Sequence, residues 1–156
     1  MAVRKILTIG DETLRKKSRT VTQVDARIRT LLADMADTLH ASGDGVGLAA
    51  PQVGVLRRVV VIDVGDGVRN YINPEIVASE GTRLVTESCL SIPGVSSELE
   101  RPEKVTVKAM DETGKEFTET ADGLLGDCLC HEIDHLDGVL FIDRAREYRA
   151  RRKPVS

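Results

Sequence analysis

The stretch His131-Glu-Ile-Asp-His135 decides how the rest of the chain is interpreted. Residues four apart on an α-helix lie one above the other on the same face, so His131 and His135 can present two imidazoles to one metal ion. Glu132 follows the first histidine, and its carboxylate can move a proton at the edge of the same site. Two nitrogen ligands and a carboxylate form the core of a metal-dependent hydrolase, although two ligands alone do not hold a catalytic ion.

The segment around this motif is typical of a helix that spans residues 122–136. Asp122 is a candidate N-cap, and Asp137-Gly138 is a typical helix end. The alternative is that two histidines fall four residues apart by chance on a helix surface. We favour the metal site, because the chain has only three histidines and two of them form this pattern on an apolar helix.

The composition is that of an ordinary globular domain. Its 156 residues are enough for one domain with a hydrophobic core, and 41% hydrophobic and 30% charged residues are usual values. The chain has no Trp, only 3% aromatic residues and a net charge of −3, which count against a domain that binds DNA or RNA.

The N-terminal residues and the cysteines indicate the cellular compartment in which the protein is expected. The N-terminus lacks the long apolar run of a signal peptide, and no later segment is long enough to span a membrane. Three cysteines, two of them within three residues, suggest reduced thiols and metal binding rather than disulfides. We therefore expect a cytoplasmic protein with no membrane partner.

The order of the predicted elements favours an α+β fold. Residues 25–41 carry one apolar stripe and are predicted to form an amphipathic helix, with His40 as a capping or surface residue at its end. We expect antiparallel β-sheets packed around a central helix that bears the His-Glu-x-x-His motif, with the amphipathic helix N-terminal to them. The other predicted elements are a short helix or turn at 11–18, strands at 58–64, 68–72, 75–87, 104–110, 115–120 and 139–142, a turn at 92–94, and a solvated basic tail from residue 144 onward.

The third metal ligand must come from another segment, and Cys89 is the best candidate. Cys130 points off the helix face that the two histidines share. Cys128 lies about 10 Å along the helix axis from His135, and metal–ligand bonds of about 2.0 to 2.3 Å cannot span that distance. Cys128 is better interpreted as a small apolar residue that faces a substrate pocket. An inert buried thiol is the alternative interpretation of Cys89.

Three motifs follow one another along the chain. They are Gly45-Val-Gly-Leu-Ala-Ala-Pro-Gln52, Glu87-Ser-Cys-Leu-Ser91, and His131-Glu-Ile-Asp-His135 with its continuation to Asp143. Together they resemble the peptide deformylase family, whose members remove the formyl group from the N-terminal methionine of new bacterial proteins. The resemblance runs from about Val3 to Asp143. Ser88 stands where the family usually has Gly, and Cys130 stands where many members have Gln.

The resemblance implies a role for most residues of these motifs. The implied metal ligands are Cys89, His131 and His135, with the fourth position left to water. Glu132 accepts a proton from the attacking water and passes it to the departing amine. The side-chain amide of Gln52 and the backbone N–H of Leu90 stabilise the oxyanion.

Further residues are expected to support the site. Glu87 orders the cysteine loop by pairing with Arg101, and Asp134 is a candidate hydrogen-bond partner around the metal rather than a base. The glycine-rich strip lets the backbone approach an extended peptide. The expected substrate-binding residues are Gly45, Val46, Gly47, Leu124, Cys128 and Leu129, of which Val46 and the last three form the methionine pocket.

The expected function is hydrolysis of N-formyl-methionyl nascent peptides with release of formate. Cysteine and histidine ligands alone would suit Zn²⁺, whereas the resemblance implies Fe²⁺, with Ni²⁺ or Co²⁺ as working substitutes; we favour Fe²⁺. We expect residues 1–145 to form one catalytic domain and residues 146–156 to form a short basic tail. The family often continues into a longer C-terminal helix, whereas this sequence ends in a short basic tail, so a transient association of the tail with the ribosome is left open.

Two other functions remain open from the sequence. A zinc metallopeptidase shares the His-Glu-x-x-His helix and takes its third ligand from a downstream residue, for which Asp137, Asp143 and Glu147 are candidates. A metal-stabilised binding protein without turnover is the second. Glu132 and Gln52 argue against it, because a structural metal site needs neither residue.

Overall fold

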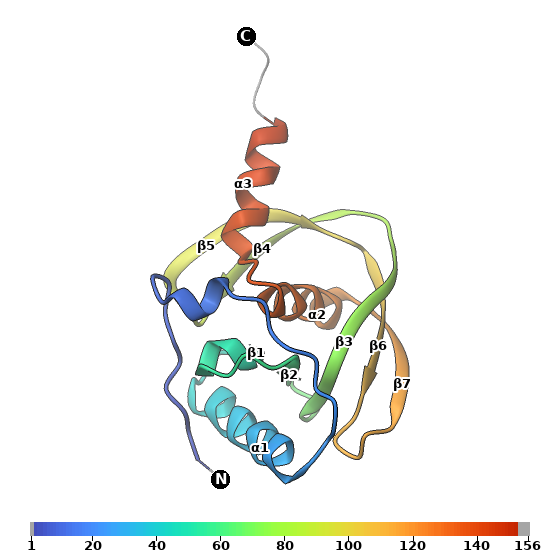
Figure 1. Cartoon of the computed structure of the whole chain (residues 1–156). Coiled ribbons are helices and arrows are strands. Elements are labelled where there is room, and N and C mark those ends of the chain that lie inside the picture. Colours follow the sequence, from blue (N-terminus) through green and yellow to red (C-terminus); the bar gives the residue numbers. More distant parts are fainter. Residues whose placement is uncertain (1, 153–156) are drawn as a thin grey trace.

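The computed structural model describes residues 2–152 and has an α+β fold with antiparallel sheets (Figure 1). In chain order the elements are η1 (Glu12–Arg15, a 3₁₀-helix), α1 (Ala26–Ala41), β1 (Gly47–Ala49), η2 (Ala50–Val53, a 3₁₀-helix), β2 (Val59–Ile62), β3 (Arg69–Glu80), β4 (Arg83–Cys89), β5 (Ile92–Arg101), β6 (Lys104–Met110), β7 (Glu116–Asp122), α2 (Gly123–Leu136) and α3 (Phe141–Arg152). None of the helices in this part of the chain combines the length and apolar character needed to cross a lipid bilayer.

Five strands form one antiparallel sheet in the order β1-β2-β3-β6-β7. Strand β2 shows how this sheet separates two cores, because successive side chains of a strand point to opposite faces. Val59 and Val61 pack in the cluster that contains α1, whereas Val60 and Ile62 pack in the cluster that contains α2. All four side chains are fully buried, so this strand is apolar on both faces.

The two longer helices therefore cover opposite faces of the sheet at β2. α1 begins after Asp25, whose carboxylate accepts a hydrogen bond from the Ile28 N–H and caps the helix. α2 lies across the middle of the molecule, with β1 and β2 on one side and the β4–β5 pair on the other (Figure 1). Residues of both sheets therefore reach the motif helix.

The strands from β3 to β5 begin and end at different residues from those predicted. The single strand expected at 75–87 is interrupted at Gly81, which has a φ of 71° that glycine adopts without strain. The turn expected at 92–94 is instead the start of β5, which pairs with β4 as a second antiparallel sheet. This hairpin carries the second motif toward α2.

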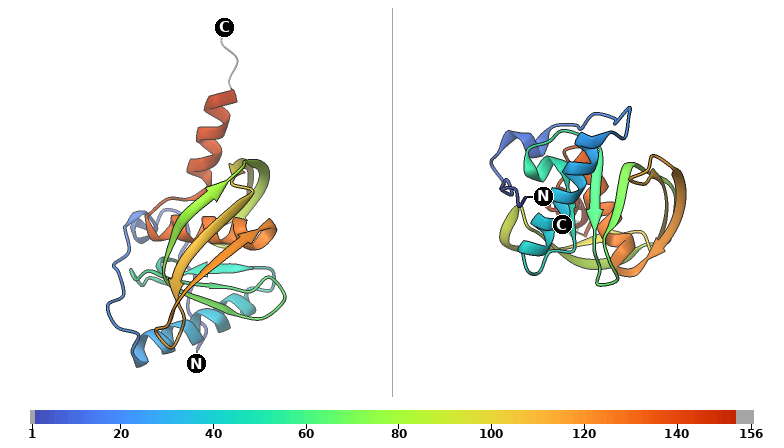
Figure 2. Two further views of the ribbon diagram at one scale, coloured as in Figure 1. Left: turned by 90° about the vertical axis from the view of Figure 1, so that its right-hand side faces the viewer. Right: turned by 90° about the horizontal axis from the view of Figure 1, so that it is seen from below.

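α3 is the largest departure from the prediction. The strand expected at 139–142 is wrong, and the segment expected as a solvated tail from residue 144 is helical as far as the structure describes it. Residues 153–156 of that tail lie outside the described residues. Asp143 accepts a hydrogen bond from the Leu140 N–H at the start of the helix. The buried side chains of α3 are Phe141, Ala145 and Tyr148. The buried side of α3 packs against β5, and the C-terminal end of the helix projects from the body of the molecule (Figure 2).

Candidate metal centre

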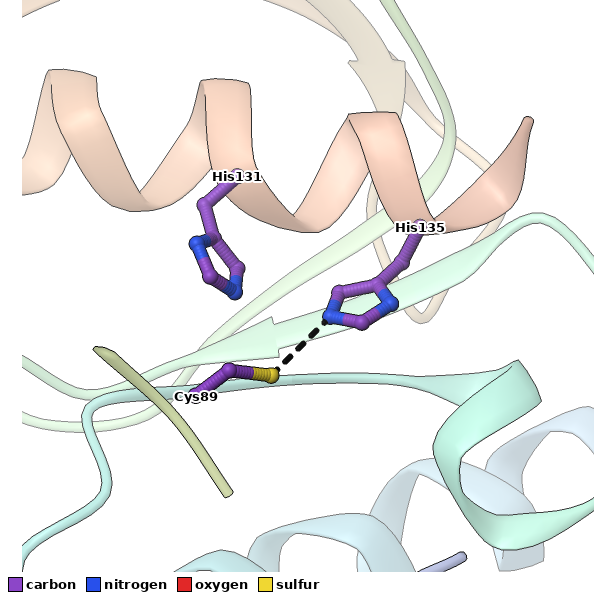
Figure 3. A group of neighbouring side chains, drawn as sticks. All are labelled: Cys89, His131 and His135. Carbon is purple, nitrogen blue, oxygen red and sulfur yellow. Dashed lines mark hydrogen bonds between the residues drawn. The ribbon is translucent and has the colours of Figure 1, made fainter. Parts of the chain in front are cut away.

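α2 presents the two histidines of its motif on one face. Asp122 occupies the N-cap position of this helix, although its side chain makes no capping hydrogen bond. Cys89, His131 and His135 each offer one donor atom, and these three atoms lie within 4.8 Å of one another. Figure 3 shows the thiol facing the two imidazoles, with its sulfur 3.3 Å from Nε2 of His135. We call these three residues the donor trio.

Cys89 reaches the histidines because β4 ends at this residue. The pairing of β4 with β5 shifts register between Ser88 and Cys89, and the chain turns back through residues 90–91. The thiol is half-buried. The fold thus brings Cys89 of the second motif to the two histidines of α2, although these segments lie about forty positions apart in the chain.

The other cysteines and the third histidine lie outside the donor trio. Cys128 and Cys130 are buried in the core between α2 and the five-stranded sheet. Burial raises the pKa of both thiols, to about 11 for Cys130, so neither is a thiolate at neutral pH. His40 is exposed and hydrogen-bonds Asp63, as expected for a surface residue.

The donor trio fits a tetrahedral divalent cation. With bonds of about 2.0 to 2.3 Å, two ligands of such an ion stand about 3.3 to 3.8 Å apart, and the Cys89–His135 distance of 3.3 Å lies at the edge of this range. Burial, followed by the charges of His131 and Arg101, lowers the pKa of His135 to about 3. The ring is therefore neutral, as metal ligation requires. Within residues 2–152, the trio is the one group of His, Cys, Asp or Glu donors with this geometry.

Glu87 fixes the orientation of His131. The ring Nδ1 and the Glu87 Oε1 are hydrogen-bonded at 2.8 Å, which leaves Nε2 to face the other two donors. Both oxygens of Glu87 also accept hydrogen bonds of 2.8 Å from Arg101. Burial disfavours the charged carboxylate, but the hydrogen bonds from Arg101 and His131 outweigh burial and lower its pKa to about 2. The expected pairing of Glu87 with Arg101 is present.

Asp134 supports the site less directly than predicted. It accepts hydrogen bonds from Arg101 at 2.9 Å and from Arg144 of α3, and within the described residues it bonds neither histidine. The reason is that neighbouring residues on a helix point about 100° apart, so Asp134 and His135 face different surroundings. Nδ1 of His135 is buried, and the described residues offer it no hydrogen-bond partner.

Glu132 is buried beside the donor trio with an unsatisfied oxygen. Among the described residues its Oε1 has no hydrogen-bond partner. Its Oε2 lies so close to Gly47 that a Cβ at that position would stand 2.7 Å from it. Burial raises the pKa of Glu132 to about 7, although His131 opposes this rise. A carboxylate whose pKa is close to neutral can take up and release a proton, and Gly47 provides the space in which it lies.

The Gln52 amide is held beside the same site. Its Oε1 accepts a hydrogen bond of 2.9 Å from the Ala49 N–H, which fixes the amide plane. Its Nε2 donates to Ser91 Oγ at 3.0 Å and lies 3.6 Å from Cys89 Sγ. Ser91 ends the second motif, but no role for its side chain was predicted from the sequence.

The family model for polypeptide deformylase matches residues 3–151. The chain belongs to this family. A peptide deformylase from Thermoanaerobacter pseudethanolicus is 58% identical over 145 residues, which cover 93% of this chain and 91% of that relative. One from Acetivibrio thermocellus is 59% identical over 144 residues, which cover 92% of this chain and 84% of that relative.

Solved deformylase structures have the same fold. The crystal structure of peptide deformylase from Thermotoga maritima matches with a TM-score of 0.89 and 40% identity, covering 92% of this chain and 98% of that chain. The structure from Legionella pneumophila matches with a TM-score of 0.89 and 45% identity, covering 98% of this chain and 100% of that chain. As a member of the polypeptide deformylase family, the chain is a hydrolase that removes the N-formyl group from nascent polypeptides. The family is metal-dependent, and the donor trio is a possible metal site.

A cavity of about 490 Å³ opens beside the donor trio of this deformylase, and Cys89, His131 and Glu132 line it. The substrate-binding residues expected from the sequence that do line it are Gly45, Val46, Gly47, Leu124 and Cys128. Leu129 does not, because one step along the helix turns its side chain about 100° away from Cys128 and into the core, where it is fully buried. The prediction that Leu129 lines the methionine pocket is therefore wrong.

The downstream carboxylates of the metallopeptidase alternative are engaged elsewhere in this deformylase. Asp137 pairs with Arg58, Asp143 with Arg15, and Glu147 with Arg144. None of the three belongs to the described donor group. No observation favours that alternative.

Proposed function

We propose that Cys89, His131 and His135 hold the catalytic metal of this deformylase and that Glu132 is the base of the reaction. The observation that carries this proposal is the convergence of three donors within 4.8 Å beside a buried carboxylate with an unpartnered oxygen among the described residues. A structural metal site is normally closed by a fourth protein ligand. The described donor group contains three ligands, which supports the enzyme over a metal-stabilised binding protein.

Glu132 carries out the proton transfers of the proposed reaction. When bound by the donor trio, the ion supplies a Lewis acid that lowers the pKa of a water molecule and polarises the formyl carbonyl. Glu132 takes the proton of the attacking water and delivers it to the nitrogen of the departing amine. The unpartnered Oε1 of Glu132 and a pKa of about 7 support both transfers, because one group must accept and then release the same proton.

Gln52 and Leu90 stabilise the negative charge that develops on the formyl oxygen. The Gln52 amide is fixed through its Oε1 by Ala49, so its Nε2 is held beside Cys89. The Leu90 N–H belongs to the peptide unit directly after Cys89. Both donors therefore lie next to one metal ligand, Cys89.

The formyl-methionyl peptide binds along β1. This strand is at the edge of the five-stranded sheet, and an edge strand offers backbone N–H and C=O groups to an extended peptide. Val46, Leu124 and Cys128 supply an apolar surface for the methionine side chain. Leu124 is 55% exposed, which leaves its side chain accessible to a substrate. The two antiparallel sheets around the central α2, with α1 behind β2, hold these walls in place.

The metal in this proposal is Fe²⁺. The donor trio would suit Zn²⁺ by ligand type alone. The resemblance to deformylases implies Fe²⁺, with Ni²⁺ or Co²⁺ as working substitutes and Zn²⁺ as a poor one. A ferrous ion on a half-buried thiolate is expected to be lost or oxidised in air, so the isolated protein can carry another metal.

Formate release from a formyl-Met tripeptide tests this proposal. Anaerobically prepared protein is loaded with Fe²⁺ or with Zn²⁺ to equal occupancy, verified by elemental analysis. We expect the iron form to turn over at least about 10-fold faster, a barrier difference of about 1.4 kcal/mol. Equal turnover by the two forms would contradict Fe²⁺ as the preferred metal, and no release by either metal-loaded form would contradict the proposed site.

We also propose that residues 146–156 form a basic extension of a catalytic domain that comprises residues 1–145. The described part of the extension is the last turns of α3, and Arg146, Arg149, Arg151 and Arg152 belong to it. Arginines of this kind can contact RNA phosphates. A transient ribosome contact would bring the enzyme to its nascent substrates in the cytoplasm. We expect truncation after residue 145 to weaken cosedimentation with ribosomes at low salt, and unchanged cosedimentation would refute the contact.

A further inference from the structure

A chain of ion pairs connects the metal-site histidine His131 to residues outside the three motifs. Arg101 lies at its centre, and its side chain is only 4% exposed. On one side Arg101 binds both oxygens of Glu87, which in turn holds Nδ1 of His131. On the other side Arg101 donates to Asp134 at 2.9 Å. The orientation of His131 therefore depends on where the Arg101 guanidinium is held.

Arg144, in the first turn of α3, closes this chain. Its Nε donates to Oδ2 of Asp134 at 3.2 Å, and its Nη2 donates to Oδ1 at 3.0 Å. The two bonds fix the plane of the Asp134 carboxylate, as paired arginine–carboxylate contacts do. Asp134 thus lies between two arginines and presents Oδ2 to Arg101 in one orientation.

Arg144 supplies the second guanidinium of this chain, and its other ion pair among the described residues is a looser one of 3.7 Å with the exposed Glu147. Glu87 and Asp134 contribute two negative charges, and Arg101 and Arg144 contribute two positive charges. Without Arg144, one guanidinium must serve two largely buried carboxylates. Asp134 can then turn and draw Arg101 away from Glu87, which loosens the hydrogen bond that orients His131.

A second contact shows that the same turn of α3 belongs to the metal centre. The buried ring of Phe141 stacks on the imidazole of His131, with ring centroids 5.9 Å apart and planes inclined by 21°. The start of α3 thus contacts the face of the ring directly and reaches its Nδ1 through the ion pairs. This contact does not depend on Arg144, so it provides an independent indication that α3 helps to place the histidine.

We propose that Arg144 is a positioning residue for the metal ligand His131 and acts through Asp134, Arg101 and Glu87. The inference rests on the proposed function, because it takes His131 to be a ligand. It places residue 144 inside the machinery of the metal centre, although the sequence pattern there is that of a solvated basic tail. Outer residues that orient metal-binding histidines commonly change metal affinity by about 10- to 100-fold when they are lost.

The affinity and visible spectrum of Co²⁺ bound to the full chain test this inference without an activity assay. We expect Arg144→Ala to weaken Co²⁺ binding about 10-fold in a chelator competition and to shift the d–d bands, because the ligand field of His131 changes. Arg151→Ala is the matched control, since Arg151 lies on α3 but pairs with Glu100. Arg144→Lys keeps the charge but not the fork of two bonds, and is expected to weaken binding about 3-fold.

A double-mutant cycle establishes the route. In an Asp134→Asn background, Arg144→Ala is expected to weaken Co²⁺ binding further by less than about 2-fold, because the two residues act in one chain of ion pairs. The inference is overturned if Arg144→Ala binds Co²⁺ as tightly as Arg151→Ala does. It is also overturned if Arg144→Ala weakens Co²⁺ binding as much in the Asp134→Asn background as in the wild type. If Arg144→Ala fails to fold, Arg144→Lys is compared with Arg151→Lys by the same criteria. The absorption band of a thiolate-to-cobalt charge transfer in the wild type distinguishes the two proposals. If the band is present and Arg144→Ala has no effect, only the positioning role is refuted. If the band is absent, the proposed metal site and this inference are refuted together.

Discussion

The Glu132→Gln variant is expected to release formate from a formyl-Met tripeptide about 10³-fold more slowly than the wild type, since a positioned general base contributes about 10²- to 10⁴-fold. Glutamine keeps the shape of the side chain but cannot accept a proton from water. Glu132 makes no hydrogen bond through Oε1 within the described residues, so no protein partner there is lost by the substitution. Steady-state kinetics on metal-loaded protein would measure the change, and we expect it in kcat.

The same variant separates catalysis from stability and metal binding. A buried carboxylate with a pKa raised to about 7 is unfavourably placed when ionised, so Glu132→Gln is expected to unfold at the same or a higher temperature than the wild type. Its metal content should be unchanged, because the donor trio is intact. Glu75→Gln, an exposed change on β3, is the matched control and should keep full activity. A Glu132→Gln enzyme with more than about a tenth of wild-type kcat would exclude Glu132 as the base.

The Cys89→Ala variant is expected to lose the metal. Two histidines leave half of a tetrahedral ion without protein ligands, so the metal bound per chain should fall by at least about 10-fold after gel filtration, and formate release should fall with it. Cys130→Ala is the matched control. That thiol is protonated and buried in the core, so the variant should keep its metal and lose only some stability. Elemental analysis of the three proteins measures the difference.

The outcome for Cys89→Ala also bears on the metallopeptidase alternative. A metallopeptidase would keep its ion without Cys89, because its third ligand would be a carboxylate downstream of His135. The three candidate carboxylates pair with arginines in this structure. Full metal occupancy in Cys89→Ala would therefore contradict the donor trio and reopen that alternative.

Local geometry explains why the donor trio could be predicted from the sequence. The relation between His131 and His135 needs only the pitch of a helix, and the helix predicted at 122–136 is present as α2 within one residue. The rise per residue excluded Cys128 as a third ligand of the same ion. The strands predicted at 104–110 and 115–120 are present as the antiparallel pair β6 and β7, because alternating side chains on either side of a turn define them locally.

The parts that were missed depend on contacts between distant segments. The segment after residue 143 is rich in arginine, so its composition suggested a solvated tail. One side of α3 is nevertheless buried against β5. The partners of Asp134 are Arg101 of β5 and Arg144 of α3, and no local sequence pattern predicts that either arginine contacts Asp134. Leu129 is different. Its inward direction follows from the helix period once Cys128 is placed at the cavity, so the sequence alone could have excluded it.

The position of the bound metal tests the account most directly. Crystals grown anaerobically from iron-loaded protein would be measured at wavelengths on both sides of the iron absorption edge, and the anomalous difference map would locate the ion. The account predicts one iron peak per chain, about 2.0 to 2.3 Å from Cys89 Sγ, His131 Nε2 and His135 Nε2, with Glu132 close by but not coordinated. An iron peak away from these three atoms, or one at which Glu132 is a fourth ligand, would contradict it.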